Sequence, residues 1–302
     1  MTVSLAPPPL RPGASVRVVA PSGPVPSDAF EAGLGALASR YAVSVSAAAR
    51  SRQGFLAGPD EARGADLVDA VTDPAVRAVI AARGGYGATR ILDAIGERVV
   101  AGLKADPKPL VGFSDVTALH ALWRVAGVRS VHGTMVAGMG RRGRDDELCA
   151  VLEGARPSAW EGLEVLHPGA PVEVSGVALG GNLALVAALV GTPWELDLDG
   201  AVLFLEDVGE APYRVDRMVT QLRSCGALAG VRAVVLGGFT DSRGGPDGVT
   251  VDEVLRERLA GLGVRVLAGA PFGHGAEHRP WVQGAVVTVH GDGRVAHDEG
   301  LA

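Results

Sequence analysis

The sequence predicts an α/β fold built around a doubly wound parallel sheet. Short apolar, β-branched runs alternate with helical patterns along the first half of the chain, which indicates parallel strands joined by crossover helices. The 302 residues are 47% hydrophobic and only 4% aromatic, and they include 43 glycines. This composition fits packed layers of Ala, Val and Leu joined by glycine turns, in two domains or one large α/β unit.

The elements of the first half follow from the spacing of apolar residues. Five apolar runs predict strands at 16–20, 43–46, 76–81, 109–111 and 129–132. Helical patterns occupy 28–41 and 59–71. A third follows the glycine-rich loop at 83–90 and runs to about residue 99, and a fourth begins at Ser114.

Charged residues, Pro and Gly cluster between 140 and 171, which indicates a connection between domains. We therefore expect an N-terminal domain at 1–145, a linker region at 146–172 and a C-terminal domain at 173–302. The predicted elements of the C-terminal domain are strands at 201–205, 231–238, 264–268 and 285–290, helices at 183–190 and from Pro212, and a hairpin turn at 291–293.

The stretch 108–123 carries the strongest candidate for a nucleophile. Its strand ends at Gly112, and Ser114 and Asp115 open a helical pattern. A serine at a sharp strand-to-helix corner exposes its hydroxyl above a sheet, beside backbone N–H groups that favour negative charge. The Gly-x-Ser-x-Gly signature is incomplete, since Val116 replaces its last glycine. Ser and Asp are also common helix N-caps, so a capping role for Ser114 stays open at this point.

A glycine-rich loop, Arg83-Gly-Gly-Tyr-Gly-Ala-Thr-Arg90, follows the predicted strand 76–81. Glycines let the backbone approach a ligand and direct N–H groups toward it. As a dinucleotide fingerprint the loop is incomplete, because Arg90 stands where Gly or Ala is needed. An acidic ribose ligand should also follow the next strand, and that strand leads to Ser114 instead. A plain tight turn is the alternative.

A serine nucleophile needs a general base. His274 and His278 share a glycine-rich loop between predicted strands, where a base is often presented. His132, at the end of a strand near Ser114, competes with them. A metal site made of both loop histidines and Glu277 is a further possibility, but no second ligand cluster has convincing spacing.

The base in turn needs an orienting acid. Glu206 and Asp207 end an apolar strand, and Glu210 follows shortly after. A carboxylate at a strand end is poorly explained by packing, although surface solvation is the default for each of the three. The order of serine, acid and histidine along the chain is one that triads use.

Charge and composition limit the expected partners. The formal net charge is −6, the pI is about 5.7, and no basic stripe is present, so we expect no nucleic-acid partner. The Pro-rich stretch 1–12 does not resemble a signal peptide, and no apolar run reaches about 18 residues. Cys149 and Cys225 do not make a disulfide framework. We expect a cytoplasmic protein with no membrane partner, no metal and no cofactor.

Several motifs, taken together and in order, point to one family. They are Val19-Ala-Pro-Ser-Gly23, Arg83-Gly-Gly-Tyr-Gly87, Gly112-Phe-Ser-Asp115, His132-Gly133, Gly181-Asn-Leu183, Leu205-Glu-Asp-Val-Gly-Glu210 with Pro212-Tyr-Arg-Val-Asp-Arg217, and Gly273-His274. On these residues the chain resembles, nearly end to end, the LD-carboxypeptidase family. These are the serine peptidases of murein recycling, together with relatives that inactivate microcin C.

The resemblance implies a Ser–Glu–His triad at Ser114, Glu206 and His274. It also implies a Rossmann-like N-terminal domain that carries the serine, and a smaller, β-rich α/β C-terminal domain that carries the other two, in a homodimer. The backbone N–H groups of Asp115 and Gly85 would face the developing oxyanion.

The resemblance also bears on the substrate. Apart from the resemblance, we expect Gly84, Tyr86 and Arg83 to contact the substrate, and Arg83 and Arg214 are the candidate cations for its terminal carboxylate. The segment from Glu206 to Arg214 is more similar to the carboxypeptidase branch than to the microcin branch, which favours a muropeptide or small peptide cut before a terminal D-alanine.

One departure from the family pattern affects that preference. His278 stands where family members usually have Asn, and Trp281-Val282 replaces a Leu-Pro pair. The role of His278 and the substrate therefore stay open. The alternatives are a microcin C-type immunity peptidase that hydrolyses an aminoacyl-nucleotide amide, and a nucleotide-binding or inactive ligand-binding protein on the same fold.

Overall fold

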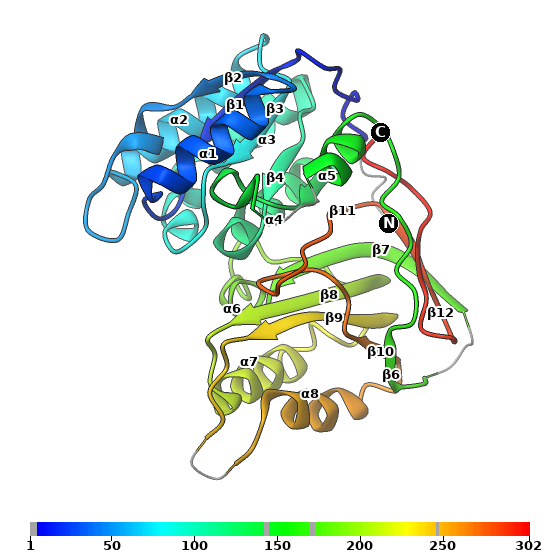
Figure 1. Ribbon diagram of the computed structural model, residues 1–302. Coiled ribbons are helices and arrows are strands. Elements are labelled where there is room, and N and C mark those ends of the chain that lie inside the picture. Colours follow the sequence, from blue (N-terminus) through cyan, green and yellow to red (C-terminus); the bar gives the residue numbers. More distant parts are fainter. Residues whose placement is uncertain (1–4, 142–144, 170–172, 246–247) are drawn as a thin grey trace. The chain divides into compact units, whose positions relative to one another are not determined.

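The computed structural model describes residues 5–141, 145–169, 173–245 and 248–302, which divide into two compact units (Figure 1). The N-terminal unit runs to Pro157 and also includes Arg279–Gly284 and Gly300–Ala302. The C-terminal unit comprises Ser158–His278 and Ala285–Glu299. Two short segments near the end of the chain therefore belong to the N-terminal unit. The expected division into three consecutive segments does not include such a return.

Within the described residues, the N-terminal unit is built on a six-stranded sheet in the order β11-β5-β4-β3-β1-β2. Its strands are β1 (Ser15–Val19), β2 (Ala42–Val45), β3 (Ala78–Ala81), β4 (Leu110–Gly112), β5 (Ser130–His132) and β11 (Trp281–Gln283). The first five pair in parallel, and β11 adds an antiparallel edge with Trp281 opposite His132. The predicted α/β fold with a parallel sheet is confirmed, and each of the five predicted strands lies within two residues of an observed one.

Helices connect and cover these strands. They are α1 (Ser27–Ala38), α2 (Asp60–Thr72), α3 (Ala88–Ala105), α4 (Thr117–Ala126) and α5 (Asp145–Leu152), with 3₁₀ turns η1 (Ala47–Arg50), η2 (Ser114–Val116) and η3 (Val136–Gly138). The α3 helix continues past its predicted end near residue 99. Val99 and Leu103 are buried and extend the apolar stripe of Ile91, Leu92 and Ile95 by further turns.

Three loops begin at the same end of this sheet, where the parallel strands have their carboxyl ends. β2 and β3 lie on opposite sides of β1, so the direction of winding reverses between β1 and β3. In open parallel sheets, ligands bind outside the carboxyl ends of the strands at such a switch point. The loops that follow β1, β3 and β4 begin at this edge, and the last of them carries Ser114.

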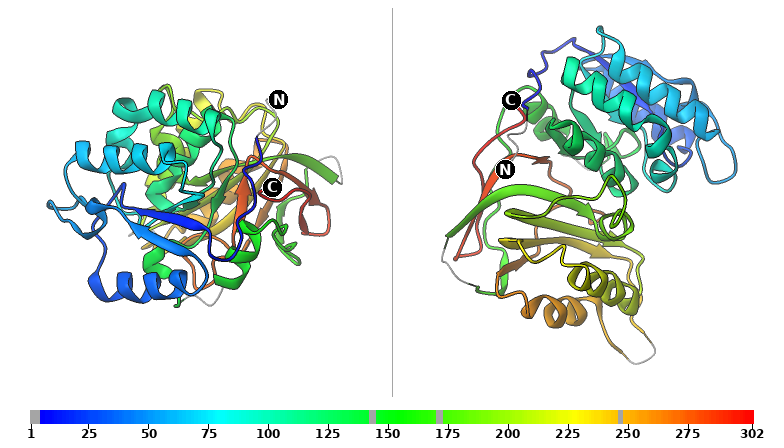
Figure 2. Two further views of the ribbon diagram at one scale, coloured as in Figure 1. Left: turned by 90° about the horizontal axis from the view of Figure 1, so that it is seen from above. Right: turned by 180° about the vertical axis from the view of Figure 1, so that it is seen from behind.

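Across its described residues, the C-terminal unit forms a seven-stranded sheet in the order β13-β12-β7-β8-β9-β10-β6. The strands are β6 (Glu164–His167), β7 (Glu173–Asn182), β8 (Ala201–Val208), β9 (Ala233–Thr240), β10 (Arg265–Ala268), β12 (Val286–His290) and β13 (Val295–His297). β7 to β10 are parallel, whereas β6, β12 and β13 pair antiparallel with their neighbours. The helices are α6 (Leu183–Ala188), α7 (Pro212–Ser224) and α8 (Val251–Ala260), and α7 and α8 lie side by side along one face of the sheet (Figures 1 and 2).

The central strand β8 is longer than predicted. The sequence predicts a strand over 201–205 with Glu206 and Asp207 at its solvated end. Instead, β8 continues because Asp207 pairs with Phe239 and Val208 pairs with Thr240 of β9. Both carboxylates therefore lie inside a buried central strand.

Aromatic side chains anchor the segment that leads to His274. The ring of Phe272 stacks on Trp160 with centroids 5.6 Å apart, and it lies 5.6 Å from the ring of Phe204 on β8. All three side chains are buried. Packing of this kind holds Phe272 at a fixed position against β8.

No helix in the described part of the chain is long and apolar enough to cross a membrane.

Candidate functional site

Ser114 lies at a sharp corner between β4 and the η2 turn. Its backbone φ of +63° is in the left-handed region, which residues other than glycine seldom adopt. The α4 helix begins only at Thr117 with Val116 as its N-cap, and neither η2 nor α4 has a side-chain cap hydrogen bond. The alternative that Ser114 caps the helix is therefore wrong. Strain at a strand-to-helix corner is instead typical of an exposed nucleophile.

The glycine loop packs directly on this corner. A Cβ at Gly84 would lie 3.0 Å from the Cβ and 3.2 Å from the Oγ of Ser114, so a side chain there would displace the serine. The carbonyl oxygen of Gly84 accepts the N–H of Gly23 at 3.1 Å, which joins the loops after β1 and β3. Gly85 follows with a φ of +110° and is exposed. The loop is thus part of the surroundings of Ser114.

The Asp115 side chain fixes the loop relative to the serine. One of its carboxylate oxygens, Oδ2, accepts the N–H of Ala88, the first residue of α3, at 2.8 Å. The carboxyl is buried, and this desolvation raises its pKa above the usual range of an aspartate. A carboxylate at a helix N-terminus also complements the helix dipole. Asp115 therefore ties the residue after the nucleophile to the end of the glycine loop.

A buried arginine holds the same loops from below. Arg63 is 1% exposed, and its guanidinium donates to the carbonyl oxygens of Gly58 at 3.2 Å and Gly87 at 3.0 Å, and also to that of Pro21. It forms an ion pair with Asp60 as well. This role of Arg63 is not predicted from the sequence, because an arginine in an amphipathic helix is normally expected on the solvated face.

Glu206 lies opposite a β-bulge of β9 in the centre of the C-terminal sheet. Its side chain is 0% exposed, and it pairs with Asn182 of β7. On the other side the register with β9 shifts, so that Gly237 and Gly238 stand opposite the single residue Glu206. Bulges increase the local twist and re-aim side chains, and they are common next to active sites.

The structure brings Glu206 and His274 together. The Nδ1 atom of His274 lies 2.6 Å from Oε2 of Glu206, and the imidazole is 18% exposed. A carboxylate at Nδ1 fixes the orientation and tautomer of the ring and leaves proton exchange to Nε2. This arrangement suits a general base.

The turn before His274 depends on Gly273. Its φ is +101°, and a Cβ would lie 2.8 Å from both the Cβ and the Oε2 of Glu206. The N–H of Gly238 donates to the carbonyl oxygen of Phe272 at 2.9 Å, which holds the turn on the bulged part of β9. The close approach of the chain to Glu206 therefore requires a residue without a side chain.

His278 holds the same turn from within. It is 0% exposed, and its Nδ1 lies 2.7 Å from the carbonyl oxygen and 3.1 Å from the nitrogen of Gly273. Nδ1 either donates to this carbonyl oxygen or accepts the N–H of Gly273, according to the tautomer, so in either form the ring supports the residue before His274. Within the described ranges, no three His, Cys, Asp or Glu side chains are grouped as a metal site.

The two histidines nearest Ser114 in the sequence lie in the core of the N-terminal unit. His132 is 0% exposed, and its ring stacks on Trp281 with centroids 4.9 Å apart. His120 contacts the Oγ of Ser130 at 2.8 Å and the carbonyl oxygen of Gly112 at 2.9 Å. Burial lowers the pKa of His120 to about 4. Both rings contribute to packing between β4, α4 and β5.

The other predicted substrate contacts are exposed. Arg83 donates from Nη1 to the carbonyl oxygen of Pro24 at 2.8 Å. The ring of Tyr86 packs edge-on against Phe55 with centroids 5.6 Å apart, and both rings are at least half exposed. In the C-terminal unit, Arg214 forms an ion pair with Glu210 at 3.7 Å.

Asp207 has a separate role that sequence reasoning did not identify. Its carboxylate accepts Nδ2 of Asn182 at 2.9 Å and the N–H groups of Ala184 at 2.9 Å and Val208 at 2.8 Å. Burial raises its pKa to about 6, and the charge of Glu206 acts in the same direction. Asp207 therefore organises the start of α6. The Gly181-Asn-Leu183 motif is the signal that could have suggested a polar partner there.

Two family models match the chain. The model described as LD-carboxypeptidase N-terminal domain matches residues 16–133, and the model described as LD-carboxypeptidase C-terminal domain matches residues 175–289. The murein tetrapeptide carboxypeptidase of Pseudomonas aeruginosa is 32% identical over 291 residues, which cover 92% of this chain and 93% of that protein.

Solved structures agree with these matches. The crystal structure of muramoyltetrapeptide carboxypeptidase from Oxalobacter formigenes superposes with a TM-score of 0.81 at 30% identity, over 93% of this chain and 97% of the other. The microcin C7 self immunity protein MccF in its wild-type apo state gives a TM-score of 0.87 at 19% identity, over 99% and 100% of the two chains. This second likeness shows a common fold.

Proposed function

Because the chain belongs to the LD-carboxypeptidase family, we propose that it is a serine carboxypeptidase that releases terminal D-alanine from murein tetrapeptides. The bond hydrolysed is the amide between an L-configured centre and the D-residue. The names of the Pseudomonas aeruginosa and Oxalobacter formigenes relatives support this substrate class.

The contact between His274 and Glu206 carries the proposal. A buried carboxylate 2.6 Å from Nδ1 stabilises the imidazolium that forms when Nε2 takes up a proton. This pair supplies the base and the orienting acid that a serine nucleophile requires. Ser114, held at a left-handed corner, is the matching nucleophile.

The proposal requires Oγ of Ser114 to reach Nε2 of His274 during catalysis. The path of the chain supports this requirement, because β11, which follows the His274 loop, pairs with β5, next to β4. One residue spans at most about 3.6 Å, so the seven steps from His274 to Trp281 cover at most about 25 Å. The loop that carries the base is thus tethered to the sheet that carries the serine.

The proposed reaction proceeds by acyl transfer. His274 takes the proton from Ser114 as Oγ attacks the amide carbonyl carbon, and it then delivers this proton to the nitrogen of the departing D-alanine. Water hydrolyses the resulting ester with His274 again acting as the base. The N–H groups of Asp115 and Gly85 stabilise the oxyanion, a contribution of about 10² to 10³ in rate for each donor. No cofactor takes part.

The decisive experiment compares wild type with Ser114→Ala on a purified tetrapeptide that ends in D-alanine. Loss of the nucleophile should lower kcat on the order of 10⁶-fold. Ser39→Ala, at an exposed helix end of the same unit, is the matched control and should keep full activity. Undiminished D-alanine release by Ser114→Ala would end the serine assignment, and loss of wild-type activity on chelation would point to a metallopeptidase.

A substrate panel tests the second half of the proposal. It contains the tetrapeptide, the same peptide with L-alanine at its end, and an acylated aminonucleotide of the microcin C type. Preferential hydrolysis of the D-alanine peptide supports the carboxypeptidase assignment. Hydrolysis of the aminonucleotide alone would indicate a microcin C-type immunity peptidase, and the serine mechanism would still hold.

A further inference from the structure

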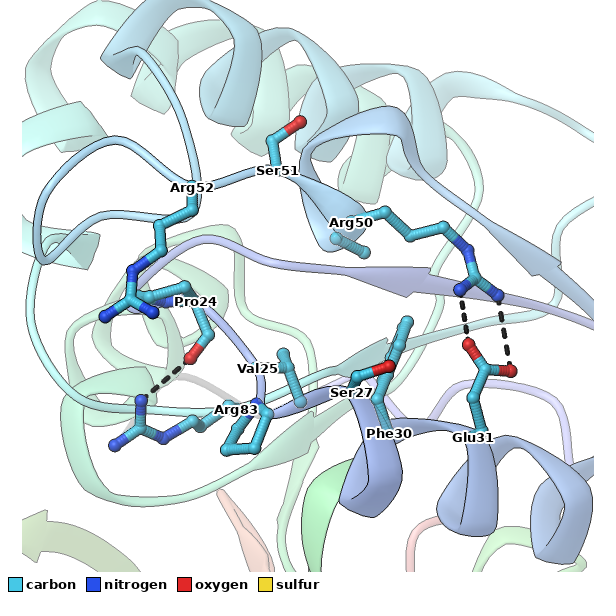
Figure 3. A pocket seen from close by; sticks show the side chains of 11 residues that line it. Pro24, Val25, Ser27, Phe30, Glu31, Arg50, Ser51, Arg52 and Arg83 are labelled. Atoms are coloured by element: carbon cyan, nitrogen blue, oxygen red, sulfur yellow. Dashed lines mark hydrogen bonds and ion pairs between the residues drawn. The ribbon is translucent and has the colours of Figure 1, made fainter.

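A cavity of about 340 Å³ opens in the N-terminal unit, and Arg83 of the glycine loop is one of its lining residues (Figure 3). Its walls come from the segments that follow β1, β2 and β3, namely 24–31, 49–52 and Arg83. These segments include the loops at the carboxyl ends of β1 and β3, between which the winding reverses. Ligands of open α/β sheets bind in that crevice. The cavity is therefore placed where the fold itself favours a ligand.

The charges around the cavity are unequally paired. Arg50 turns to one side and forms an ion pair with Glu31 (Figure 3). Arg52 donates from Nε to the carbonyl oxygen of Gly54 at 3.4 Å, and Arg83 donates from Nη1 to that of Pro24 at 2.8 Å. Among the described residues, neither of these two guanidinium groups has a carboxylate partner. The lining thus carries two positive charges that no acidic side chain of the described chain neutralises.

Both of these guanidinium groups lie on the same side of the cavity, next to Pro24 (Figure 3). The bond from Arg83 to the Pro24 carbonyl holds one of them in place. A guanidinium group presents several N–H donors in a planar fork that matches a carboxylate. Two guanidinium groups that line one cavity, neither paired with a carboxylate among the described residues, favour an anionic ligand.

The glycine loop connects the cavity to the proposed nucleophile, because Arg83 lines the cavity and Gly84 packs on Ser114. Arg83 immediately precedes Gly84, and a Cβ on Gly84 would touch the Ser114 side chain. A Cβ on Gly23 would lie 3.5 Å from Nη1 of Arg83 and 3.1 Å from the carbonyl oxygen of Gly84. Arg83 therefore belongs to the loop that contacts the serine side chain.

We infer that Arg52 and Arg83 form an anion subsite that binds a carboxylate of the peptide substrate while Ser114 attacks its amide bond. The inference rests on the proposed function for the identity of the substrate. The carboxylate is either the terminal one of the residue that is released or one carried by a residue before the scissile bond. Both share the chemistry that the two guanidinium groups recognise, and the experiment separates them.

The test is a cycle of protein and substrate changes. Arg52→Gln and Arg83→Gln remove the charge, and the peptides are the free tetrapeptide, its C-terminal amide, and a form with its internal carboxylates amidated. On the free peptide each variant should raise KM about 10-fold, with a smaller effect on kcat. Arg98→Gln, on the exposed side of α3, is the control and should behave as wild type.

The pattern across substrates decides the inference. If the subsite binds the terminal carboxylate, Arg83→Gln should raise KM little for the C-terminal amide. If it binds an internal carboxylate, Arg83→Gln should raise KM little for the internally amidated peptide. An equal rise in KM for all three peptides, or no rise for any of them, would show that the two arginines do not form this subsite. Arg83→Lys, which keeps the charge without the fork, should restore part of the lost affinity.

Binding in the Ser114→Ala background separates this inference from the proposed function. Calorimetry with the same peptides measures the subsite without turnover. If the wild-type protein hydrolyses none of the peptides but the Arg83→Gln change still weakens binding of the free peptide alone, the subsite stands and the carboxypeptidase assignment falls. If turnover is observed but binding is insensitive to both arginines, the assignment stands and the subsite is wrong.

Discussion

Gly273 packs so closely on Glu206 that the glutamate leaves no space for a side chain at position 273. A Cβ there would lie 2.8 Å from the Oε2 atom that bonds to His274. The orientation of the proposed base is thus set by its neighbour in the chain as well as by its carboxylate partner. Both constraints act in the C-terminal unit alone, so they can be tested by changes that leave the Ser114 corner untouched.

Gly273→Ala should abolish most of the activity while the protein stays folded. The φ of +101° disfavours alanine by about 1–3 kcal/mol, and the added methyl group must displace Glu206. A shift of about 1 Å in a catalytic group costs on the order of 10² in rate, so we expect kcat to fall at least that far. The measurement is kcat on the tetrapeptide together with the thermal midpoint.

The matched control for this change is Gly275→Ala in the same loop. A Cβ at Gly275 meets only the carbonyl oxygen of Glu277 at 3.8 Å, which is ordinary van der Waals contact. Its kcat should therefore stay within about twofold of wild type. Equal kcat values for the two variants would show that the contact between Gly273 and Glu206 does not orient the base.

His278 should act as a positioning residue for His274. Its Nδ1 forms a hydrogen bond with the backbone of Gly273, to the carbonyl oxygen or from the N–H according to the tautomer, so His278→Ala removes the support of the turn. We expect kcat to fall about 10- to 100-fold with little change in KM. His278→Asn keeps a polar group near the position of Nδ1 and should recover part of the loss. A His278→Ala variant with wild-type kcat and an unchanged pH profile would contradict this role.

The prediction of this fold from sequence succeeds where local patterns and packing agree. Alternating apolar runs place β1 to β5, since a buried parallel strand needs a short run of β-branched residues. The same patterning identifies the corner at Ser114. It does not indicate the capping state of the serine, because a nucleophile elbow and an N-cap use the same residue types. Only the backbone conformation distinguishes them.

Other features of the site depend on pairing across long distances. The register shift that places two glycines opposite Glu206 arises between β8 and β9, and β11 joins a sheet built from residues more than a hundred positions earlier. Neither leaves a periodic signal in its own segment. Buried charges such as Arg63 are hidden in the same way, since their partners are backbone carbonyls of distant loops.

Gly84→Ala should disable Ser114 without affecting the base. The new methyl group would lie 3.0 Å from Cβ and 3.2 Å from Oγ of the serine, so the nucleophile must move. We expect labelling of Ser114 by a serine-directed phosphonylating probe to slow at least 10-fold. Gly35→Ala on the exposed side of α1, where a Cβ meets nothing within 4 Å, should label normally and stabilise the protein by about 0.5–1 kcal/mol. Equal labelling rates for both variants would contradict the steric argument.

Asp207 should make the protein less stable as the pH rises from about 4 to 6. Burial raises the pKa of Asp207 to about 6 in the folded protein, against about 3.8 for the free side chain. Between these values the folded state holds more protons than the unfolded state, so stability falls with rising pH. A shift of about two pKa units corresponds to about 3 kcal/mol. The free energy of unfolding of Asp207→Asn, relative to wild type, should therefore rise by up to that amount across this range.

Urea unfolding at pH 4 to 8 measures this difference, and Glu253→Gln provides a control of opposite sign. The hydrogen bonds from Thr250 at the start of α8 lower the pKa of Glu253, so its contribution to stability is present at neutral pH and is lost as the pH falls. Glu253→Gln should therefore lose stability relative to wild type as the pH rises, whereas Asp207→Asn gains it. A constant difference between Asp207→Asn and wild type would mean that Asp207 ionises in the folded protein as it does in the unfolded chain.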